Sequence, residues 1–542
     1  MVEKLFNRLN KICNDILFNN IKKNKKIILL EFHGWKALHI IQGIISNILA
    51  KKNFSKIIGY SLIHNFENLK TNRKFLENFK WIIGNIFWIK TFGIYKKMNV
   101  SKIHKFTYSR NDLIRSKKFI KKLYIENLNK KKILNLHINK IYVGDILYDT
   151  YIKIYNQPTI DPTALHFMNF LKRFIAVFYC VESFIQKENI SDVICSHATY
   201  VEGLPLRIAS YKKIKCFLVT IEKIYQITKI NPYANKEYLN FRKTFSNLNK
   251  KNKSKSIILA KKKLEIRLQG KLGDMLYLTK TSYGKINKKR VLSRNKKKKI
   301  LIAAHSFCDA PHARGKGIFN DFYEWIIFLF ELSENSQFDW YIKCHPNFYE
   351  YFDDTVSNLK ELLKKYKNVK WIDPQTSNAQ IIKEGINLAL TVDGSIGIEY
   401  PYFDIPVINA SRNNPHINYK FNHHPKNLIE YKDKIINFYK LKKKIKHNEI
   451  FECYFMNFLY FKNDWFFASF DDVVSYHGGN FTNLYKSDKI YKYLNDNFDN
   501  NRLTEITDAF LKFYKTRDYV LNFNHFGKNI STIIKNEFKQ LN

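Results

Sequence analysis

Two short segments about fifty residues apart place polar side chains directly after apolar runs. Residues 341–346 read Tyr-Ile-Lys-Cys-His-Pro, and residues 390–408 begin Leu-Thr-Val-Asp-Gly-Ser-Ile-Gly-Ile-Glu and end Pro-Val-Ile. Each apolar run is typical of a buried β-strand, and a parallel sheet opens its ligand sites at the carboxyl ends of its strands. We therefore expect His345 and Ser395 to face one cleft.

The Asp393-Gly-Ser-Ile-Gly turn has the residues that a phosphate-binding helix start requires. Gly394 permits a tight turn, Ser395 caps a helix or donates to phosphate, and Gly397 lets the backbone approach a ligand closely. Glu399, in the first helical turn, is suited to accept hydrogen bonds from ribose hydroxyls. An ordinary capped helix is the alternative. The spacing does not match the G-x-S-x-G nucleophile elbow.

His345 follows a strand and precedes Pro346, which ends further strand pairing. Its ring is therefore expected to point from the strand end into the cleft, and Lys343, two positions earlier, shares its face. A lone histidine is more often structural than functional. Its pairing with the Ser395 turn, on a strand of the same sheet, favours ligand binding.

A third segment, residues 305–317, is dense in functional groups and leaves another strand end. His305 and Ser306 begin it, Asp309 is placed to orient a hydroxyl or a ribose, and Arg314 is suited to stabilise a leaving phosphate. A metal site at His305, Asp309 and His312 is an alternative, although Pro311 and the lack of a downstream ligand disfavour it. A plain surface loop is the other.

Alternating strand and helix patterns must position these groups. The N-terminal part reads strand 26–32, helix 36–51 and strand 56–62, with further strands at 191–196 and 213–218. The later part has strands at 299–304, 340–344, 369–372, 388–392 and 405–408, with helices at 320–334, 355–366, 378–384 and after 395. This order predicts an α/β fold with two Rossmann-like lobes.

We place the domain boundaries where the composition changes. Residues 1–225 are predicted to form an N-terminal Rossmann-like lobe, and residues 226–298 a helical, lysine-rich connector. Residues 299–430 form the second Rossmann-like lobe, and residues 431–542 a helical segment that packs on the lobes.

Composition restricts the partners. The formal net charge is +45, and the excess of lysine over arginine is best explained by coding bias toward A and T. Diffuse lysine suits anionic phospholipid better than sequence-specific nucleic acid, so we expect peripheral contact with the inner face of the cytoplasmic membrane. Seven scattered cysteines indicate reduced thiols in a cytoplasm, and no signal core or 18-residue uncharged apolar stretch is found.

These motifs carry a resemblance. Lys343-Cys-His-Pro346, followed by Gly394-Ser-Ile-Gly-Ile-Glu399 and the Pro406-Val-Ile408 strand, resembles bacterial capsule polysaccharide glycosyltransferases of the Kdo transferase and polysialyltransferase group. The resemblance covers residues 299–410 and is only architectural before them. It implies a GT-B arrangement of two lobes that face a cleft, a donor phosphate bound by His345 and Ser395, and no metal or cofactor.

The resemblance also implies a general base in an acid-acid-glycine loop of the first lobe. This chain has Val201-Glu202-Gly203, so the first acidic position is absent and Glu202 is the matching residue. Glu202 would deprotonate the acceptor hydroxyl as it attacks the anomeric carbon; alternatively it caps the following helix. His33, next to Gly34 at the first strand end, is the rival base, and Glu31 and His197 are weaker candidates.

The leading hypothesis is a glycosyltransferase that moves a sugar from a nucleotide-sugar donor to a surface polysaccharide or its lipid-linked primer. The alternatives are a CDP-polyol phosphotransferase and a non-catalytic glycan-binding or assembly protein. The sequence does not identify the sugar, the nucleotide, the acceptor, the stereochemical course or the oligomeric state.

Overall fold

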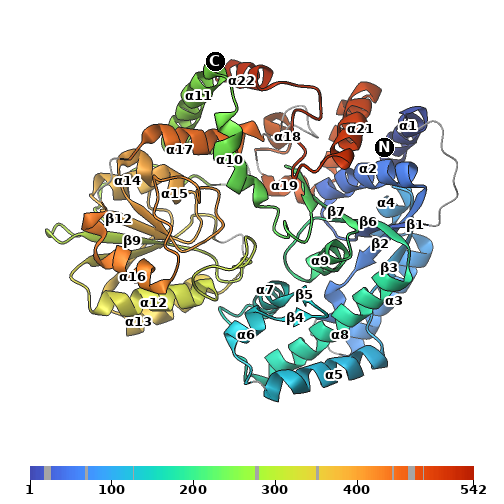
Figure 1. Cartoon of the computed structure of the whole chain (residues 1–542), viewed down its shortest axis with the longest axis horizontal. Helices are drawn as coiled ribbons and strands as arrows, with labels where there is room; N and C mark the ends of the chain where they lie inside the picture. The colour runs from blue at the N-terminus through green and yellow to red at the C-terminus, as the bar shows by residue number, and fades with distance from the viewer. Residues whose placement is uncertain are drawn as a thin grey trace. The chain divides into compact units, whose positions relative to one another are not determined.

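The computed structural model describes residues 1–16, 26–66, 71–125, 127–274, 280–348, 353–441, 445–461, 470–479 and 481–541. The chain divides into two compact units (Figure 1). Unit 1 comprises residues 1–150, 161–234 and 462–528, and unit 2 comprises residues 151–160, 235–461 and 529–542.

Unit 1 is built on a sheet whose described strands follow the order β3-β2-β1-β6-β7-β8. The strands are β1 (Lys26–Glu31), β2 (Ser55–Ser61), β3 (Val100–Lys105), β6 (Ile190–Cys195), β7 (Lys215–Val219) and β8 (Ile224–Ile227). All neighbouring pairs are parallel except β7 and β8. The chain adds strands on one side of β1 and then on the other, as in doubly wound α/β folds.

Helices surround this sheet, and four of them come from the C-terminal part of the chain. The helices are α1 (Val2–Ile16), α2 (Lys36–Asn53), α3 (Thr71–Phe87), α4 (Thr91–Lys97), α5 (Arg110–Ile125), α6 (Lys130–Leu134), α7 (Gly144–Tyr155), α8 (Leu165–Lys187), α9 (Leu204–Tyr211), α18 (Phe470–Tyr476), α19 (Phe481–Lys486), α20 (Lys489–Asn497) and α21 (Asn500–Lys515). A short hairpin, β4 (His137–Ile138) with β5 (Ile141–Tyr142), precedes α7, whose last residues belong to unit 2.

Unit 2 has an all-parallel sheet in the order β11-β10-β9-β12-β13. Its strands are β9 (Lys299–Ala304), β10 (Asp339–Cys344), β11 (Val369–Ile372), β12 (Leu388–Thr391) and β13 (Val407–Asn409), and its helices are α10 (Lys236–Ser246), α11 (Lys250–Leu268), α12 (Phe322–Glu334), α13 (Thr355–Lys365), α14 (Asn378–Lys383), α15 (Ile396–Glu399), α16 (Leu428–Ile436), α17 (His447–Tyr454) and α22 (Ile530–Lys539).

Strand alternation sends side chains to two cores in unit 2. Ile300 and Ile302 pack with Trp325 and Leu329 of α12 on one face. Leu301, between them, packs with residues of α14 and α15 on the other face. Because both faces are covered, residues 300–304 of β9 are apolar on both faces, as expected of a central strand in a parallel sheet. Figure 1 shows this sheet between its flanking helices. The predicted α/β fold with Rossmann-like lobes is confirmed in both units.

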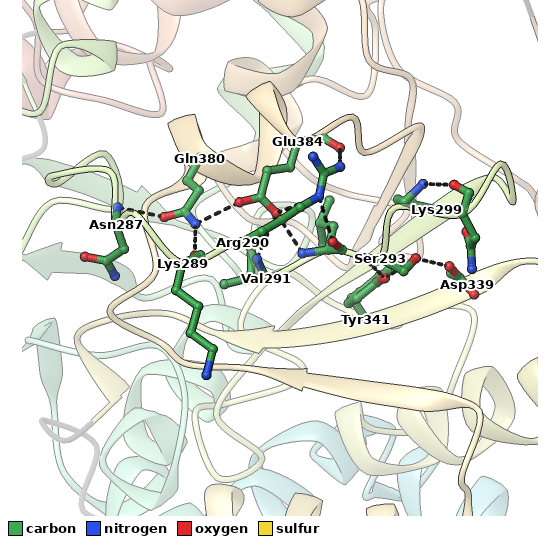
Figure 2. A network of polar contacts seen from close by, with 12 residues as sticks. Asn287, Lys289, Arg290, Val291, Ser293, Lys299, Asp339, Tyr341, Gln380 and Glu384 are labelled. Carbon is green, nitrogen blue, oxygen red and sulfur yellow. Dashed lines mark hydrogen bonds and ion pairs between the residues drawn. The ribbon is translucent and has the colours of Figure 1, made fainter.

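The predicted connector is helical only in its first part, α10 and α11. Residues 280–298 form no helix or strand and are held by side chains instead (Figure 2). Glu384 Oε2 accepts from the backbone nitrogens of Val291 at 2.9 Å and Leu292 at 2.7 Å, and Gln380 Nε2 donates to the Lys289 carbonyl at 2.9 Å. These bonds supply the backbone partners that a helix would otherwise provide.

Candidate functional site

The ends of β9 and β12 form the switch point of the unit 2 sheet. From β9 the chain proceeds through β10 and β11 on one side, and then adds β12 and β13 on the other. The loops after β9 and β12 therefore diverge and leave a crevice, which is where doubly wound sheets bind ligands. A cavity of about 280 Å³ lies there. Its polar lining residues are Ser282, His305, Ser306, Asp309, Arg314, Lys343, His345, Thr355, Asn378, Thr391, Asp393, Ser395 and Glu399.

Lys343 is a buried cation in the wall of this cavity. It is 5% exposed, and its ammonium makes no hydrogen bond or ion pair within the described part of the chain. Burial lowers the pKa of Lys343 to about 8, against the opposing influence of Cys344 and Glu399. A buried ammonium without a partner is unfavourable, so this position favours an anionic ligand.

His345, at the end of the same strand, is held as a neutral hydrogen-bond donor. Its Nδ1 accepts from the backbone nitrogen of Asn347 at 3.1 Å, which places the ring proton on Nε2. Nε2 lies 3.2 Å from Ser282 Oγ and borders the cavity. Burial, with nearby Lys343 and Arg267, lowers the pKa of His345 to about 3. The ring therefore has an uncharged N–H at Nε2, and a ligand would have to compete with Ser282 Oγ for it. Pro346 is buried and lies outside the cavity lining.

The Ser395 turn reaches the same cavity from β12, so His345 and Ser395 both line it. Ser395 does not cap the following helix with its side chain. That helix, α15, is a single turn because Pro401 follows and the chain continues as a 3-10 turn. A phosphate bound here would consequently depend on side chains more than on a helix terminus. Gly394 donates its N–H to Thr391 Oγ1 at 3.1 Å.

Gly397 serves packing instead of ligand approach. A Cβ at this position would lie 2.5 Å from His416 Cε1 and 3.1 Å from Asn422 Nδ2. Asn422 donates to the Gly397 carbonyl at 2.6 Å. The glycine thus allows a later loop to fit against the Ser395 turn, which its sequence position alone does not reveal.

Glu399 is paired inside the protein. Its side chain is 1% exposed; Oε1 accepts from Arg267 Nε at 2.8 Å, and Oε2 accepts from Tyr283 Oη at 3.1 Å. Both oxygens are therefore engaged, and a ribose would have to compete with these bonds. The ion pair between Arg267 and Glu399 anchors α11 beside the cavity. Arg267 and Tyr283 were missed by sequence reasoning because they lie in a lysine-rich stretch without a recognisable motif.

The loop after β9 is tied to the loop after β12. His305 Nε2 lies 3.1 Å from Thr391 Oγ1, and Arg314 Nε pairs with Asp393 at 2.7 Å. Ser306 donates to Asp353. His305 and Ser306 thus shape the cavity, and Arg314 shares its charge with Asp393. Asp309 is exposed at the rim.

His312, which the sequence offered with His305 and Asp309 as an alternative metal site, is bonded to the backbone instead. It is buried, and Nε2 lies 2.7 Å from the Asn320 carbonyl. Over the described ranges, no set of three His, Cys, Asp or Glu residues is arranged to hold a metal ion.

Unit 1 has a second polar cluster at its own switch point, between β1 and β6. Glu31, which is buried, accepts from Ser196 N and Ser196 Oγ, both at 2.6 Å. Ser196 Oγ also lies 2.8 Å from His197 Nδ1. Since the hydroxyl proton goes to Glu31, His197 must donate from Nδ1, which leaves its Nε2 as an acceptor. In this arrangement the Nε2 of His197 can accept a proton, which the position of His197 in the sequence does not indicate.

His33 is less available than the sequence suggested. Its Nδ1 accepts from the backbone nitrogen of Trp35 at 3.2 Å, and Nε2 lies 3.0 Å from Gln42 Oε1. Both ring nitrogens are therefore engaged, and burial lowers the pKa of the ring despite nearby Glu31. The role of His33 as general base stays a prediction, and the ring would have to break one of these bonds to accept a proton.

Glu202, the other predicted base, has a raised pKa. Burial, and then the charge of Glu31, raise its pKa to about 7. Its backbone is fixed, because Tyr60 Oη donates to the Glu202 carbonyl at 3.2 Å.

The turn around Glu202 is strained and tightly packed. Tyr200 has a φ of 55° and a ψ of −179°, a strained conformation for a residue with a side chain. A Cβ at Gly203 would lie 2.6 Å from the Ala198 backbone carbon, so only glycine fits there.

Each unit is thus a doubly wound α/β unit with polar side chains gathered at its switch point. No family model and no curated protein matches the chain. Among solved structures, KpsC from Thermosulfurimonas dismutans, a beta Kdo 2,4 transferase, is similar over 49% of this chain and 79% of its own, with 13% identity and a TM-score of 0.31.

Two UDP-GlcNAc 2-epimerases are also similar. The enzyme from Methanocaldococcus jannaschii, in complex with UDP-GlcNAc and UDP, matches over 79% of this chain and 98% of its own, with 13% identity and a TM-score of 0.23. That from Neisseria meningitidis, bound to UDP-GlcNAc, matches over 79% and 97%, with 12% identity and a TM-score of 0.24. These values are too low to assign a function to this chain.

Proposed function

We propose that this protein is a glycosyltransferase that takes a sugar from a nucleotide-sugar donor and transfers it to a surface polysaccharide of the capsule type or to its lipid-linked primer. The observation that carries the proposal is Lys343 in the switch-point cavity, a buried ammonium with no hydrogen bond or ion pair to the described residues. The N–H of His345 and the hydroxyl of Ser395 border the same cavity. A donor phosphate would satisfy all three.

A nucleotide sugar fits this environment better than a simple anion. The cavity is also lined by apolar and hydroxyl-bearing side chains, among them Leu301, Ala303, Phe348 and Thr355. A nucleotide sugar combines a charged diphosphate with a ribose, a base and a sugar, so it needs both kinds of lining. Transfer would need no metal, because the leaving diphosphate would be stabilised by Lys343 and the hydrogen-bond donors beside it.

The test is a panel of nucleotide sugars with the wild-type protein, read first by thermal stabilisation and then by product analysis. Selective stabilisation by one donor, followed by sugar transfer and release of its nucleotide, is expected. Incorporation of a polyol phosphate from a CDP-linked donor would replace the proposal with a phosphotransferase. Binding of glycan without any nucleotide binding would replace it with a non-catalytic protein.

The pH dependence of donor binding provides a sharper prediction. Lys343 has a pKa of about 8 without ligand, and a bound phosphate favours its charged form. Affinity should therefore fall as the pH rises above about 8, and binding at pH 8.5 should take up a proton. Titration calorimetry in buffers of different ionisation enthalpy measures this uptake. Affinity that is constant from pH 7 to pH 9.5 would rule out Lys343 as the phosphate ligand.

We propose Glu202 as the base that deprotonates the acceptor. A base must be ionised to accept a proton, so with a pKa of about 7 the value of kcat/KM should rise with pH and level off above about 7. Glu202→Gln should lower kcat by roughly 10²–10⁴-fold and leave donor affinity unchanged. His197→Gln and Asp309→Asn are the comparison variants. If Glu202→Gln keeps its kcat and His197→Gln loses it, the base is His197.

A further inference from the structure

Helix α3 of unit 1 exposes a continuous apolar stripe. Leu76, Phe79, Ile82 and Ile86 recur every three or four residues, and Phe87 and Ile89 extend the stripe into the turn before α4. Exposure ranges from 45% for Ile89 to 70% for Phe87. We call these six residues the α3 stripe. Scattered exposed apolar residues are ordinary, but a patch of this kind indicates a surface that another body covers.

The stripe cannot turn inward, because the opposite face of α3 is already packed. Trp81 contacts Phe32 and Phe92, with ring centroids 5.3 Å and 5.1 Å away. Asn85 Nδ2 donates to the Ile103 carbonyl of β3 at 3.2 Å. At Gly84, a Cβ would lie only 2.6 Å from the Phe92 ring. The helix is thus apolar on both faces, and among the described residues of unit 1 only the face with Trp81 has a partner.

In the sequence from residue 78 to residue 111, which includes most of the α3 stripe, the charge has a single sign. Between Glu77 and Asp112 the sequence has no acidic residue, whereas it has seven cations: Lys80, Lys90, Lys96, Lys97, Lys102, Lys105 and Arg110. Lys80, Lys90, Lys96 and Lys97 are exposed. Lys96 lies over the ring of Trp88, in the turn that follows α3, at 5.9 Å. Apolar and aromatic groups bordered by lysine match the requirements of an anionic lipid surface.

We propose that the α3 stripe is a membrane-docking surface that lies in the interface of an anionic phospholipid bilayer, with the surrounding lysines on lipid phosphates. A second copy of the chain is a poorer occupant, because a symmetric contact would bring the same lysines together. None of the described helices is both long and apolar enough to cross a bilayer, and the proposal is for a helix that lies along the surface. This surface belongs to unit 1 and stands independently of the nucleotide site in unit 2.

The test is sedimentation of the full-length chain with vesicles of phosphatidylcholine alone or with 30% phosphatidylglycerol. The wild type should bind the anionic vesicles at least about tenfold more strongly, and this preference should weaken in 0.5 M salt. Ile86→Asp with Phe87→Asp should reduce binding to anionic vesicles by at least about tenfold. Both side chains are exposed, so thermal unfolding should not change.

The matched control is Ile429→Asp on α16, where an isoleucine is 83% exposed but lies on unit 2. It should bind vesicles as the wild type does. Equal binding by Ile86→Asp/Phe87→Asp and the wild type, or no wild-type binding to either vesicle, would overturn the proposal. Ultracentrifugation gives the other decisive outcome: a dimer that this double variant dissociates would assign the stripe to a second copy instead of a membrane.

Discussion

Lys343→Met should weaken donor binding and at the same time make the protein harder to unfold. The substitution removes the buried positive charge that we assign to the donor phosphate in the switch-point cavity. A charge-assisted hydrogen bond contributes about 1.5–3 kcal/mol, so affinity for the best nucleotide sugar should fall by roughly 10- to 150-fold. Isothermal titration measures the change.

The gain in stability follows from the burial of Lys343. Its pKa falls from 10.5 in the unfolded chain to about 8 in the folded protein, so the folded state disfavours the charge. Methionine has a similar shape without charge, and the free energy of unfolding should rise by about 1–3 kcal/mol. Because the penalty is present at and below pH 8 and disappears as the lysine loses its proton, this gain should shrink as the pH rises to about 10.5.

Lys367→Met is the matched control, since Lys367 is exposed on the same unit. It should change neither affinity nor stability. Loss of binding together with loss of stability in Lys343→Met would mean that Lys343 holds the fold. Unchanged binding would mean that the donor phosphate lies elsewhere.

Arg267→Met should be the most destabilising of these substitutions. Arg267 and Glu399 are both buried, and Arg267 Nε donates to Glu399 Oε1 at 2.8 Å. Removal of the arginine leaves a buried carboxylate with only the Tyr283 hydroxyl, and breaking such a pair costs about 3–5 kcal/mol. Denaturant unfolding, followed by fluorescence, should show an earlier transition for unit 2.

Two comparisons separate the loss of the ion pair from the loss of packing. The double variant Arg267→Met/Glu399→Gln has no unpaired charge and should recover a large part of the lost stability. Arg242→Met removes an arginine whose side chain is 40% exposed and lies 3.2 Å from Glu449, so it should cost no more than about 1 kcal/mol. If Arg267→Met lowered the free energy of unfolding no more than Arg242→Met does, the buried ion pair would not stabilise the packing of α11 within unit 2.

The framework of unit 2 could be predicted from the sequence because its strands are short, apolar and separated by clear helix patterns. The predicted strands at 299–304 and 369–372 match β9 and β11. The presence of His345 and Ser395 in one cavity follows from the order of these strands, since the ends of parallel strands meet at one edge of a sheet.

The partners of the site residues could not be predicted, because they come from distant parts of the chain. Ser282 reaches His345 from a segment without secondary structure, which Gln380 and Glu384 hold in place (Figure 2). Arg267 is 132 residues from Glu399 in sequence, and its helix carries no periodic signal for a buried cation. Local patterns do not encode such contacts.

The same limit applies to unit 1. Its sheet was partly anticipated, but residues 462–528 also belong to this unit, and a helical C-terminal pattern does not say where it packs. The hydrogen bond from Ser196 to Glu31 joins residues 165 positions apart. This bond determines the tautomer of His197. The sequence does not reveal the bond, so His197 could be judged as a candidate base only from its position after a strand.

A crystal structure with the nucleotide sugar that stabilises the protein most would test the central claim directly. We expect a donor phosphate within hydrogen-bond distance of Lys343 Nζ and His345 Nε2, with Ser395 Oγ beside it, in the crevice between the ends of β9 and β12. A nucleotide bound elsewhere, with this crevice holding only solvent, would contradict the assignment of the donor site.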